Sequence, residues 1–239
     1  MSGRIRNRLL AALEAETFEA IRPDLEPTDL PLDMILLQPR EPIRWVYFLE
    51  SGLSSDVAMV SEERGVECGL AGFDGLAGIP VLLGMDRGIH TSVMQVGGTG
   101  HRMAAGRLRV AMDAHPDLRR VLLAYVHIFL TQSAQSAACN ARHSVEQRLA
   151  RWLLMSSDRT ADPEVPLTHA YLSLMLGIRR AGVTVAIHVL EGEGLIRSMR
   201  GRTTIRDRAG LERRSCSCYR LVRDEQLRVF AAHPVEAEP

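Results

Sequence analysis

The chain has 239 residues, 46% of them hydrophobic, which is enough to bury a core in one large or two small domains. Its formal net charge is zero, and all 29 basic residues are arginines, so a P-loop or a Schiff-base site, each of which requires a lysine, is excluded. Four scattered cysteines are too few for a disulfide framework in a chain of this size.

The first part of the chain predicts a short helix followed by many short strands. Residues 4–21 have amphipathic helical spacing, and Pro23 then ends the pattern. From Met34 to about Val110, short β-like runs alternate with Pro, Gly and charged clusters, which is typical of a sandwich or barrel. We therefore expect a small antiparallel β-roll within an α+β fold.

Glycines recur at every third position from Gly69 to Gly78 in this region. Such a repeat is compatible with a phosphate-binding loop or with tight corners of the β-roll. We favour corners, because no helix with a basic or Ser/Thr start follows to hold a phosphate. A second glycine cluster, residues 97–100, does not complete a dinucleotide fingerprint, because Met103 occupies the place of the third glycine.

A long helix is predicted to begin at His115-Pro116-Asp117. An apolar series follows with spacings of 4, 3 and 4 residues, as in the a/d seam of a coiled coil. The helix could pack on its own β-roll, but its length favours a two-fold dimer seam. The residues expected in this seam are Leu118, Leu122, Tyr125 and Phe129.

The next segment predicts a helix-turn-helix and a basic hairpin. After a helix from Val145 to Ser157 and a polar junction (158–166), Thr168 can cap a short helix that ends at Gly177. A second helix begins near Arg179, and residues 195–207 resemble a hairpin with a basic tip. Two short helices followed by a basic hairpin are typical of a winged helix, whose second helix enters the DNA major groove.

The charge distribution supports this assignment. Residues 165–223 carry 11 arginines against four acidic residues, whereas residues 1–164 have a balance of −4 and the tail from residue 224 a balance of −3. A basic module within an otherwise acidic chain is the pattern expected of a nucleic-acid-binding domain.

Several features argue against other functions. The eight histidines form no HExxH pattern, and no Gly-x-Ser-x-Gly elbow is present, so we do not expect an enzyme. Cys216-Ser217-Cys218 is a weak redox or metal signal without partner ligands, and we expect it to serve packing, with no metal or cofactor bound. The apolar run near Val121–Leu130 is too short for a membrane span, and no secretory signal pattern is visible, which predicts a cytoplasmic protein without membrane association.

The order of these elements resembles the CRP/FNR superfamily of bacterial transcription regulators. The sharpest similarity is Leu176-Gly177-Ile178-Arg179-Arg180, followed by Leu190-Glu191 and Gly194-Leu195-Ile196, and His115-Pro116-Asp117-Leu118 resembles the usual start of the dimer helix. The resemblance implies a β-roll sensor-like domain (1–114), a dimerisation helix (115–143), a winged helix-turn-helix domain (144–223) and an acidic tail (224–239).

The effector residues of the family are replaced. Cyclic-nucleotide-binding members carry Gly-Glu and Arg-Ser or Arg-Thr, where this chain has Gly78-Ile79 and His90-Thr91, with Arg87 at a different offset. Members with an iron–sulfur cluster use N-terminal cysteines, and here the first cysteine is Cys68. We therefore expect neither cyclic AMP binding in the usual manner nor an iron–sulfur sensor.

The resemblance implies a homodimer that binds an inverted repeat in double-stranded DNA and contacts RNA polymerase. An alternative is a ligand-gated regulator whose β-roll binds an unidentified small molecule. Arg179 and Arg180 are expected at bases or flanking phosphates, and Val185 stands where family members often carry a second base-reading side chain. The remaining residues expected at DNA are Thr168, His169, Gly182, Thr184, Arg197, Arg200 and Arg202.

Overall fold

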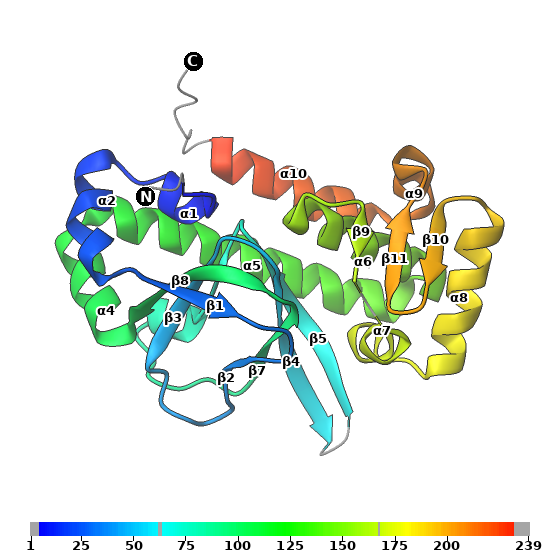
Figure 1. Ribbon diagram of the computed structural model, residues 1–239, viewed down its shortest axis with the longest axis horizontal. Helices are drawn as coiled ribbons and strands as arrows, with labels where there is room; N and C mark the ends of the chain where they lie inside the picture. Colours follow the sequence, from blue (N-terminus) through cyan, green and yellow to red (C-terminus); the bar gives the residue numbers. More distant parts are fainter. Residues whose placement is uncertain (1–4, 62–63, 167, 232–239) are drawn as a thin grey trace.

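The computed structural model describes residues 5–61, 64–166 and 168–231 and confirms the α+β fold. A β-roll and a winged helix lie along one long helix, α5 (Figure 1). The roll consists of two four-stranded antiparallel sheets, with strand orders β1-β8-β3-β6 and β2-β7-β4-β5. The strands are β1 (Glu26–Leu30), β2 (Ile35–Leu37), β3 (Trp45–Leu49), β4 (Leu53–Ser61), β5 (Arg64–Ala71), β6 (Leu76–Ala77), β7 (Thr91–Val96) and β8 (Gly98–Ala104).

The helices connect the roll to the C-terminal module, in which β10, β11 and β9 form a small antiparallel sheet. None of the helices in the described ranges combines the length and apolar composition needed to cross a bilayer. The elements are α1 (Arg8–Ala11), α2 (Ala15–Ile21), a 3-10 turn (Arg22–Asp24), α3 (Ile79–Leu82), α4 (Ala105–Ala114), α5 (Pro116–Arg142), α6 (Val145–Thr160), β9 (Glu164–Val165), α7 (His169–Leu176), α8 (Arg180–Gly192), β10 (Ile196–Met199), β11 (Arg202–Ile205), α9 (Arg208–Arg214) and α10 (Ser217–Ala231).

The expected N-terminal helix is two short helices rather than one. Asn7 caps α1 by accepting from the amides of Leu9 and Leu10, and its Nδ2 donates to the carbonyls of Leu49 and Gly75, both at 2.8 Å. This buried amide therefore fixes the chain to the β-roll just before α1. The single helix predicted over residues 4–21 was wrong because the chain breaks between α1 and α2, where the Glu14 amide donates to Asp117 Oδ2 of α5 at 3.4 Å, a tertiary contact that periodicity does not show.

The residues expected in a dimer seam pack against their own β-roll instead. Leu118, Leu122 and Tyr125 are buried in the core beneath the roll, and Phe129 packs on that cluster. A Cβ added at Gly69 or Gly75 would collide with the ring of Phe129 or of Tyr125, so these glycines let α5 approach the strands. The a/d pattern thus marks the face of α5 that packs on the core, and Gly69 and Gly75 leave room for its aromatic side chains.

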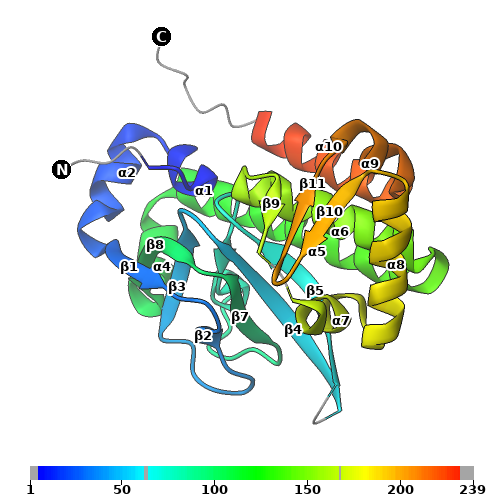
Figure 2. The ribbon, with the colours of Figure 1, turned by 45° about the vertical axis from the view of Figure 1, so that its right-hand side comes forward.

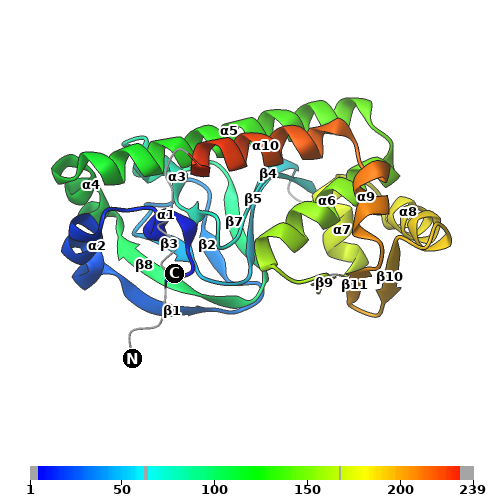
Figure 3. The same cartoon turned by 90° about the horizontal axis from the view of Figure 1, so that it is seen from above.

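The acidic tail expected from residue 224 is partly helical. Residues 224–231 continue α10, which lies beside α5 (Figure 3). Glu225 Oε1 lies 2.6 Å from His127 Nε2 of α5, and Gln226 donates to the buried Asp74 of the roll. The last helix, α10, therefore connects the C-terminal module to α5 and to the β-roll. Residues 232–239 lie outside the described ranges.

A buried polar junction joins the roll to α6. Arg159 of α6 is 4% exposed; its Nε lies 3.1 Å from Asp74 Oδ2, and its Nη2 donates to Gln132 Oε1 at 2.8 Å. Asp74 is itself 4% exposed. Because a buried charge is costly unless it is paired, this contact strongly constrains how α6 sits on the roll.

Candidate nucleic-acid interface

The turn between α7 and α8 is a Schellman motif at Gly177. Gly177 has φ 61°, and its amide donates to the Leu174 carbonyl at 3.2 Å, while the Ile178 amide donates to the Ser173 carbonyl at 3.1 Å. Only glycine adopts this left-handed conformation at little cost. At the other end of α7, Thr168 Oγ1 accepts from the Tyr171 amide, which confirms the predicted N-cap. The sequence therefore fixes the helix-turn-helix locally.

The second helix, α8, has one buried face and one outward face. Val183, Ala186, Ile187 and Leu190 are buried against α6 and the rest of the C-terminal core. The outward face holds Arg180, Thr184, Val185 and His188, with Val185 59% exposed. His188 was not predicted at this surface, although its place four residues after Thr184 is a helical signal for the same face.

Arg179 and Arg180 stand at the start of α8 as expected. Arg179 is the N-cap residue, and Arg180 is the first helical residue. Both side chains are exposed, and among the described residues neither forms an ion pair. Thr184 Oγ1 donates to the Arg180 carbonyl at 3.1 Å, and Gly182 is half-buried. The two guanidinium groups are therefore available to bind an anion or a base edge.

The predicted wing is an antiparallel hairpin with a glycine tip. Ile196 pairs with Ile205 and Met199 with Arg202, and Gly201 at the tip has φ 78°. Arg197 and Arg200 are exposed; so is Arg202, whose Nη1 lies 3.7 Å from Glu164 Oε1 of β9. The sequence placed Glu164 in a junction and missed β9, which is only two residues long.

A recess of about 630 Å³ separates the outward face of α8 from the wing. The Ser198 amide donates to Glu191 Oε1 at 2.7 Å and holds the hairpin to α8. The structure brings three of the predicted contact residues, Thr168, Thr184 and Arg200, to this recess. The side chain of His169, which was also predicted here, lies outside the described part of the chain. The other residues around the recess are Ile187, His188, Glu191, Ser198, Met199 and Gly201.

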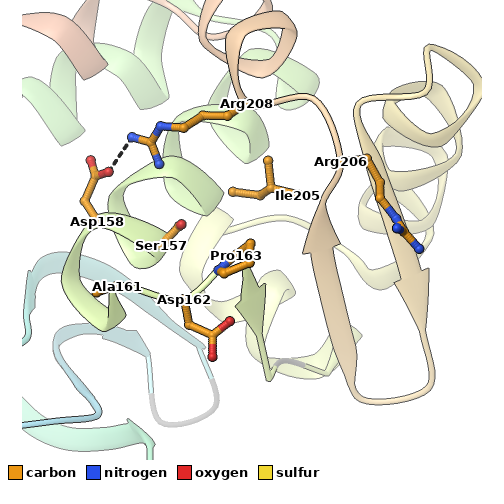
Figure 4. Close-up of a pocket in the computed structure, with 8 residues that line it drawn as sticks. All are labelled: Ser157, Asp158, Ala161, Asp162, Pro163, Ile205, Arg206 and Arg208. Atoms are coloured by element: carbon orange, nitrogen blue, oxygen red, sulfur yellow. Dashed lines mark hydrogen bonds and ion pairs between the residues drawn. The ribbon is translucent and has the colours of Figure 1, made fainter.

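Arg208 supports the base of the wing. Its guanidinium donates to Asp158 Oδ1 at 2.5 Å and to Tyr219 Oη at 2.8 Å, and Tyr219 in turn donates to Asp158 Oδ2 at 2.9 Å. Figure 4 shows Arg208 turned toward Asp158 across a pocket of about 410 Å³, whereas Arg206 points away from this pair. Burial opposes the charge on Arg208, but its bonds to Asp158 outweigh this effect and raise its pKa. The Arg208 side chain therefore binds α9 to α6 through Asp158.

A second polar cluster, centred on the half-buried Glu67, joins α6 and α7 to the β-roll. Glu67 of β5 accepts from Ser55 Oγ at 2.5 Å and from Trp152 Nε1 of α6 at 2.9 Å. Burial raises the pKa of Glu67 to about 7 against these hydrogen bonds. Met175 of α7 lies beside it, with its sulfur 3.9 Å from Ser55 Oγ. The first helix of the helix-turn-helix therefore rests on β5, as Figure 2 shows.

Three cysteines and one histidine meet behind this module. Cys139, Cys216 and Cys218 are buried together, and His143 lies beside them. The hydrogen bond between Cys139 and Cys216 lowers the pKa of Cys216 and raises that of Cys139, because the two sulfur atoms share a proton. Packing alone was predicted for Cys216 and Cys218, because their partners are more than 70 positions earlier in the chain.

The effector positions of the roll carry the substituted residues noted above. Gly78, with φ 126°, precedes Ile79, which begins α3. Arg87 donates to the Arg40 carbonyl at 2.8 Å, and His90 is exposed. Apolar side chains fill the space between the two sheets: Leu30, Leu36, Tyr47, Leu49, Ala77 and Met94.

This geometry defines a winged helix-turn-helix beside a β-roll, the architecture of a DNA-binding regulator. Residues 147–214 match the family model of the Crp-like helix-turn-helix domain. A search of curated protein sequences finds no significant match.

Solved structures show the same fold over most of the chain. FixK2 from Bradyrhizobium japonicum is 16% identical, with a TM-score of 0.68, and the match covers 80% of this chain and 98% of that one. The c-di-GMP responsive global regulator CLP from Xanthomonas campestris is 17% identical, with a TM-score of 0.66 and coverage of 80% and 99%. A CRP/FNR-family transcriptional regulator from Thermus thermophilus is 22% identical, with a TM-score of 0.64 and coverage of 80% and 98%. The resemblance to the CRP/FNR superfamily is thus confirmed at the level of the fold, which covers most of the chain, and residues 147–214 carry the Crp-like helix-turn-helix domain.

Proposed function

We propose that the protein is a homodimeric transcription regulator that binds an inverted-repeat DNA site in the cytoplasm. The observation that carries this proposal is the outward face of α8, where exposed Arg179 and Arg180 stand beside a basic wing. A helix of this kind fits the major groove with its N-terminal residues at base edges. The match to a Crp-like helix-turn-helix domain supports regulation of transcription rather than catalysis, and contact with RNA polymerase belongs to the same proposal.

The contacts divide into two groups. Arg180 is suited to a guanine edge, because its planar guanidinium can donate two parallel hydrogen bonds, and Val185 is suited to a thymine methyl group. The second group binds phosphates and fixes the register without choosing a sequence. It consists of Thr168, His169, Arg197, Arg200 and Arg202, while Gly182 and Thr184 allow the backbone of α8 to approach.

The predicted seam is buried against the β-roll, so the dimer would use a different, exposed face of α5. Leu123 is 42% exposed and Leu130 60% exposed, and exposed alanines at positions 134, 137 and 141 continue the line toward the end of the helix. The spacings of 7, 4, 3 and 4 residues keep these side chains on one heptad face. Two such helices packed about a two-fold axis would present the two α8 helices about 34 Å apart.

Selection from random-sequence duplexes by the full-length protein tests this function. The recovered sites should be inverted repeats whose half-sites are centred about 10 base pairs apart. Leu130→Arg should reduce dimerisation in sedimentation experiments and weaken binding to these sites. Leu221→Arg, at a similarly exposed leucine of α10, is the matched control and should change neither. Recovery of isolated half-sites, or no enrichment at all, would contradict the proposal.

A second candidate function is ligand gating through the β-roll. The specific observation in its favour is the direct contact of α7 with β5, together with the Glu67 and Met175 contacts that join roll and DNA-binding module. A small molecule that shifts the strands would move α7 with them. Thermal unfolding against a panel of metabolites tests this: a compound that raises the Tm and changes DNA affinity supports gating. If no compound that raises the Tm changes the DNA affinity relative to the ligand-free protein, the result favours a regulator that is controlled only by the amount of protein.

A further inference from the structure

Four side chains with metal-ligand chemistry converge where the DNA-binding module joins the long helix. Cys139 lies in the last turn of α5, and His143 is the C-cap residue that follows the helix. Cys216 immediately precedes α10, and Cys218 is in its first turn. Three separate chain positions, namely the end of α5, the link to α6 and the start of α10, thus meet at one point.

The distances suit a single tetrahedral ion. The sulfur atoms of Cys139 and Cys216 are 3.4 Å apart, and Cys218 Sγ lies 3.7 Å from His143 Nδ1. All four ligand atoms lie within 4.8 Å of one another. A tetrahedral zinc ion with Zn–S bonds near 2.3 Å separates its sulfur ligands by about 3.8 Å, so that small side-chain adjustments would complete the geometry. The compact spacing favours one ion over a polynuclear iron–sulfur cluster, whose several metal and sulfide atoms require more room between the ligands.

The surroundings suit the charge of such a site. Three thiolates and a neutral imidazole around a divalent cation carry a net charge of −1. The positive charge of Arg151 acts on both Cys139 and Cys218, and Arg148 interacts electrostatically with Cys139. The Nε atoms of Arg148 and Arg151 are buried without a hydrogen-bond partner among the described residues. Thiolates are good acceptors for nearby donors of this kind, which commonly support the ligands of a metal site.

We propose that Cys139, His143, Cys216 and Cys218 form a structural zinc site that fastens the DNA-binding module to α5 and α10. The Cys₃His ligand set fills all four positions, which is characteristic of structural rather than catalytic zinc. Because Cys139 lies in the last turn of α5 and His143 lies in the link to α6, the ion would set the direction in which α6 and the helix-turn-helix leave the long helix. This site goes beyond the proposed function. Metal binding does not depend on the protein being a DNA-binding regulator, and only the expected effect on DNA affinity rests on that proposed function.

Metal titration of the full-length chain tests the site. The protein is purified under reducing conditions, stripped with a chelator and titrated with Co²⁺, then with Zn²⁺. We expect one equivalent of Co²⁺ to give the intense visible absorption and the thiolate-to-cobalt charge-transfer band of a tetrahedral site, and Zn²⁺ to displace it. Cys139→Ser, Cys218→Ser and His143→Gln should each weaken binding by about 100-fold or more, because losing a ligand costs at least as much as losing its supporting partner.

Cys68→Ser is the matched control, because Cys68 lies on β5 and its thiol donates to the Asp56 carbonyl. This variant should bind Co²⁺ like the wild type. Zn²⁺ should raise the Tm of the wild type and of Cys68→Ser but not of the ligand variants, and far-UV circular dichroism of the metal-free proteins shows whether each variant folds. The proposal is overturned if the reduced wild type gives no tetrahedral cobalt spectrum, if Cys68→Ser loses binding like the ligand variants, or if the isolated protein holds an iron–sulfur cluster at these residues.

DNA binding provides a separate measurement. Metal-free protein should bind the selected duplex more weakly than zinc-loaded protein, and Cys68→Ser should show the same difference. If the cobalt spectrum is present but neither form binds any duplex, the proposed function fails while the metal site stands. If both forms bind DNA equally, the ion does not set the direction of the module, and that part of the inference is overturned.

Discussion

The arginines of the reading surface and those of the domain junction are chemically identical but have opposite roles. Arg180 on α8 is exposed and forms no ion pair among the described residues, whereas Arg159 on α6 is 4% exposed and lies between Asp74 and Gln132. One group is free to bind a partner, and the other satisfies a buried carboxylate of its own chain. The difference shows that a count of basic residues locates a candidate DNA-binding domain, but only burial and pairing identify which arginines are available to DNA.

The largest expected effect follows from removing the junction arginine. Arg159→Ala leaves Asp74 buried without its cation and should lower the free energy of unfolding by about 3–5 kcal/mol. Urea denaturation measures this change. Arg180→Ala is the control and should stay within about 0.5 kcal/mol of wild type, since the side chain is exposed. Equal stability of the two variants would contradict the distinction between the two groups of arginines.

A pH effect at Glu67 comes next in size. Burial raises its pKa to about 7, above an ordinary value near 4.5, so between these pH values the folded chain keeps a proton that the unfolded chain releases. The free energy of unfolding should therefore fall as pH rises through this interval, by up to about 3 kcal/mol. Glu67→Gln should flatten this dependence, as measured by urea denaturation at about pH 5 and pH 8. If the free energy of unfolding of Glu67→Gln falls with pH as steeply as that of the wild type, another titrating group causes the pH dependence.

At the reading surface, Arg180→Ala should weaken binding to the selected site by about 1–3 kcal/mol and leave binding to random duplex much less affected. The reason is that a bidentate contact to a guanine edge exists only at the specific site. Fluorescence anisotropy with both duplexes measures the two affinities. A loss of equal size on both would reassign Arg180 from base reading to phosphate binding.

The smallest effects are expected on the wing. Arg200→Ala and Arg202→Ala should weaken binding to all duplexes alike and lower the salt dependence by about one phosphate contact each. A plot of the logarithm of the binding constant against that of salt concentration gives this slope. An unchanged slope would remove the wing arginines from the interface.

The sequence predicted the local features of the fold well. The Schellman turn at Gly177, the cap at Thr168 and the hairpin around Gly201 depend on neighbouring residues, and each was recognisable from its own segment. The prediction that this face of α5 forms a dimer seam was wrong. An a/d pattern looks the same whether it packs on a partner helix or, as at Tyr125, on the chain's own β-roll. Likewise, the β9 strand is too short to have a pattern.

The least predictable features combine residues far apart in the chain. Glu67 meets Trp152 across 85 positions, and Cys139 meets Cys216 across 77. No spacing rule joins such pairs, because the turns and helices between them determine where each residue lies. The buried junction and the sulfur cluster therefore emerged only from the folded structure.

The decisive measurement compares the affinity of the full-length protein for its selected inverted repeat with its affinity for a scrambled duplex at the same salt concentration. The repeat should bind about a thousandfold tighter or better, with two protein chains per duplex. Equal affinity for the two duplexes, or binding to neither at low salt, would contradict the assignment of α8 and the wing as a DNA-reading surface.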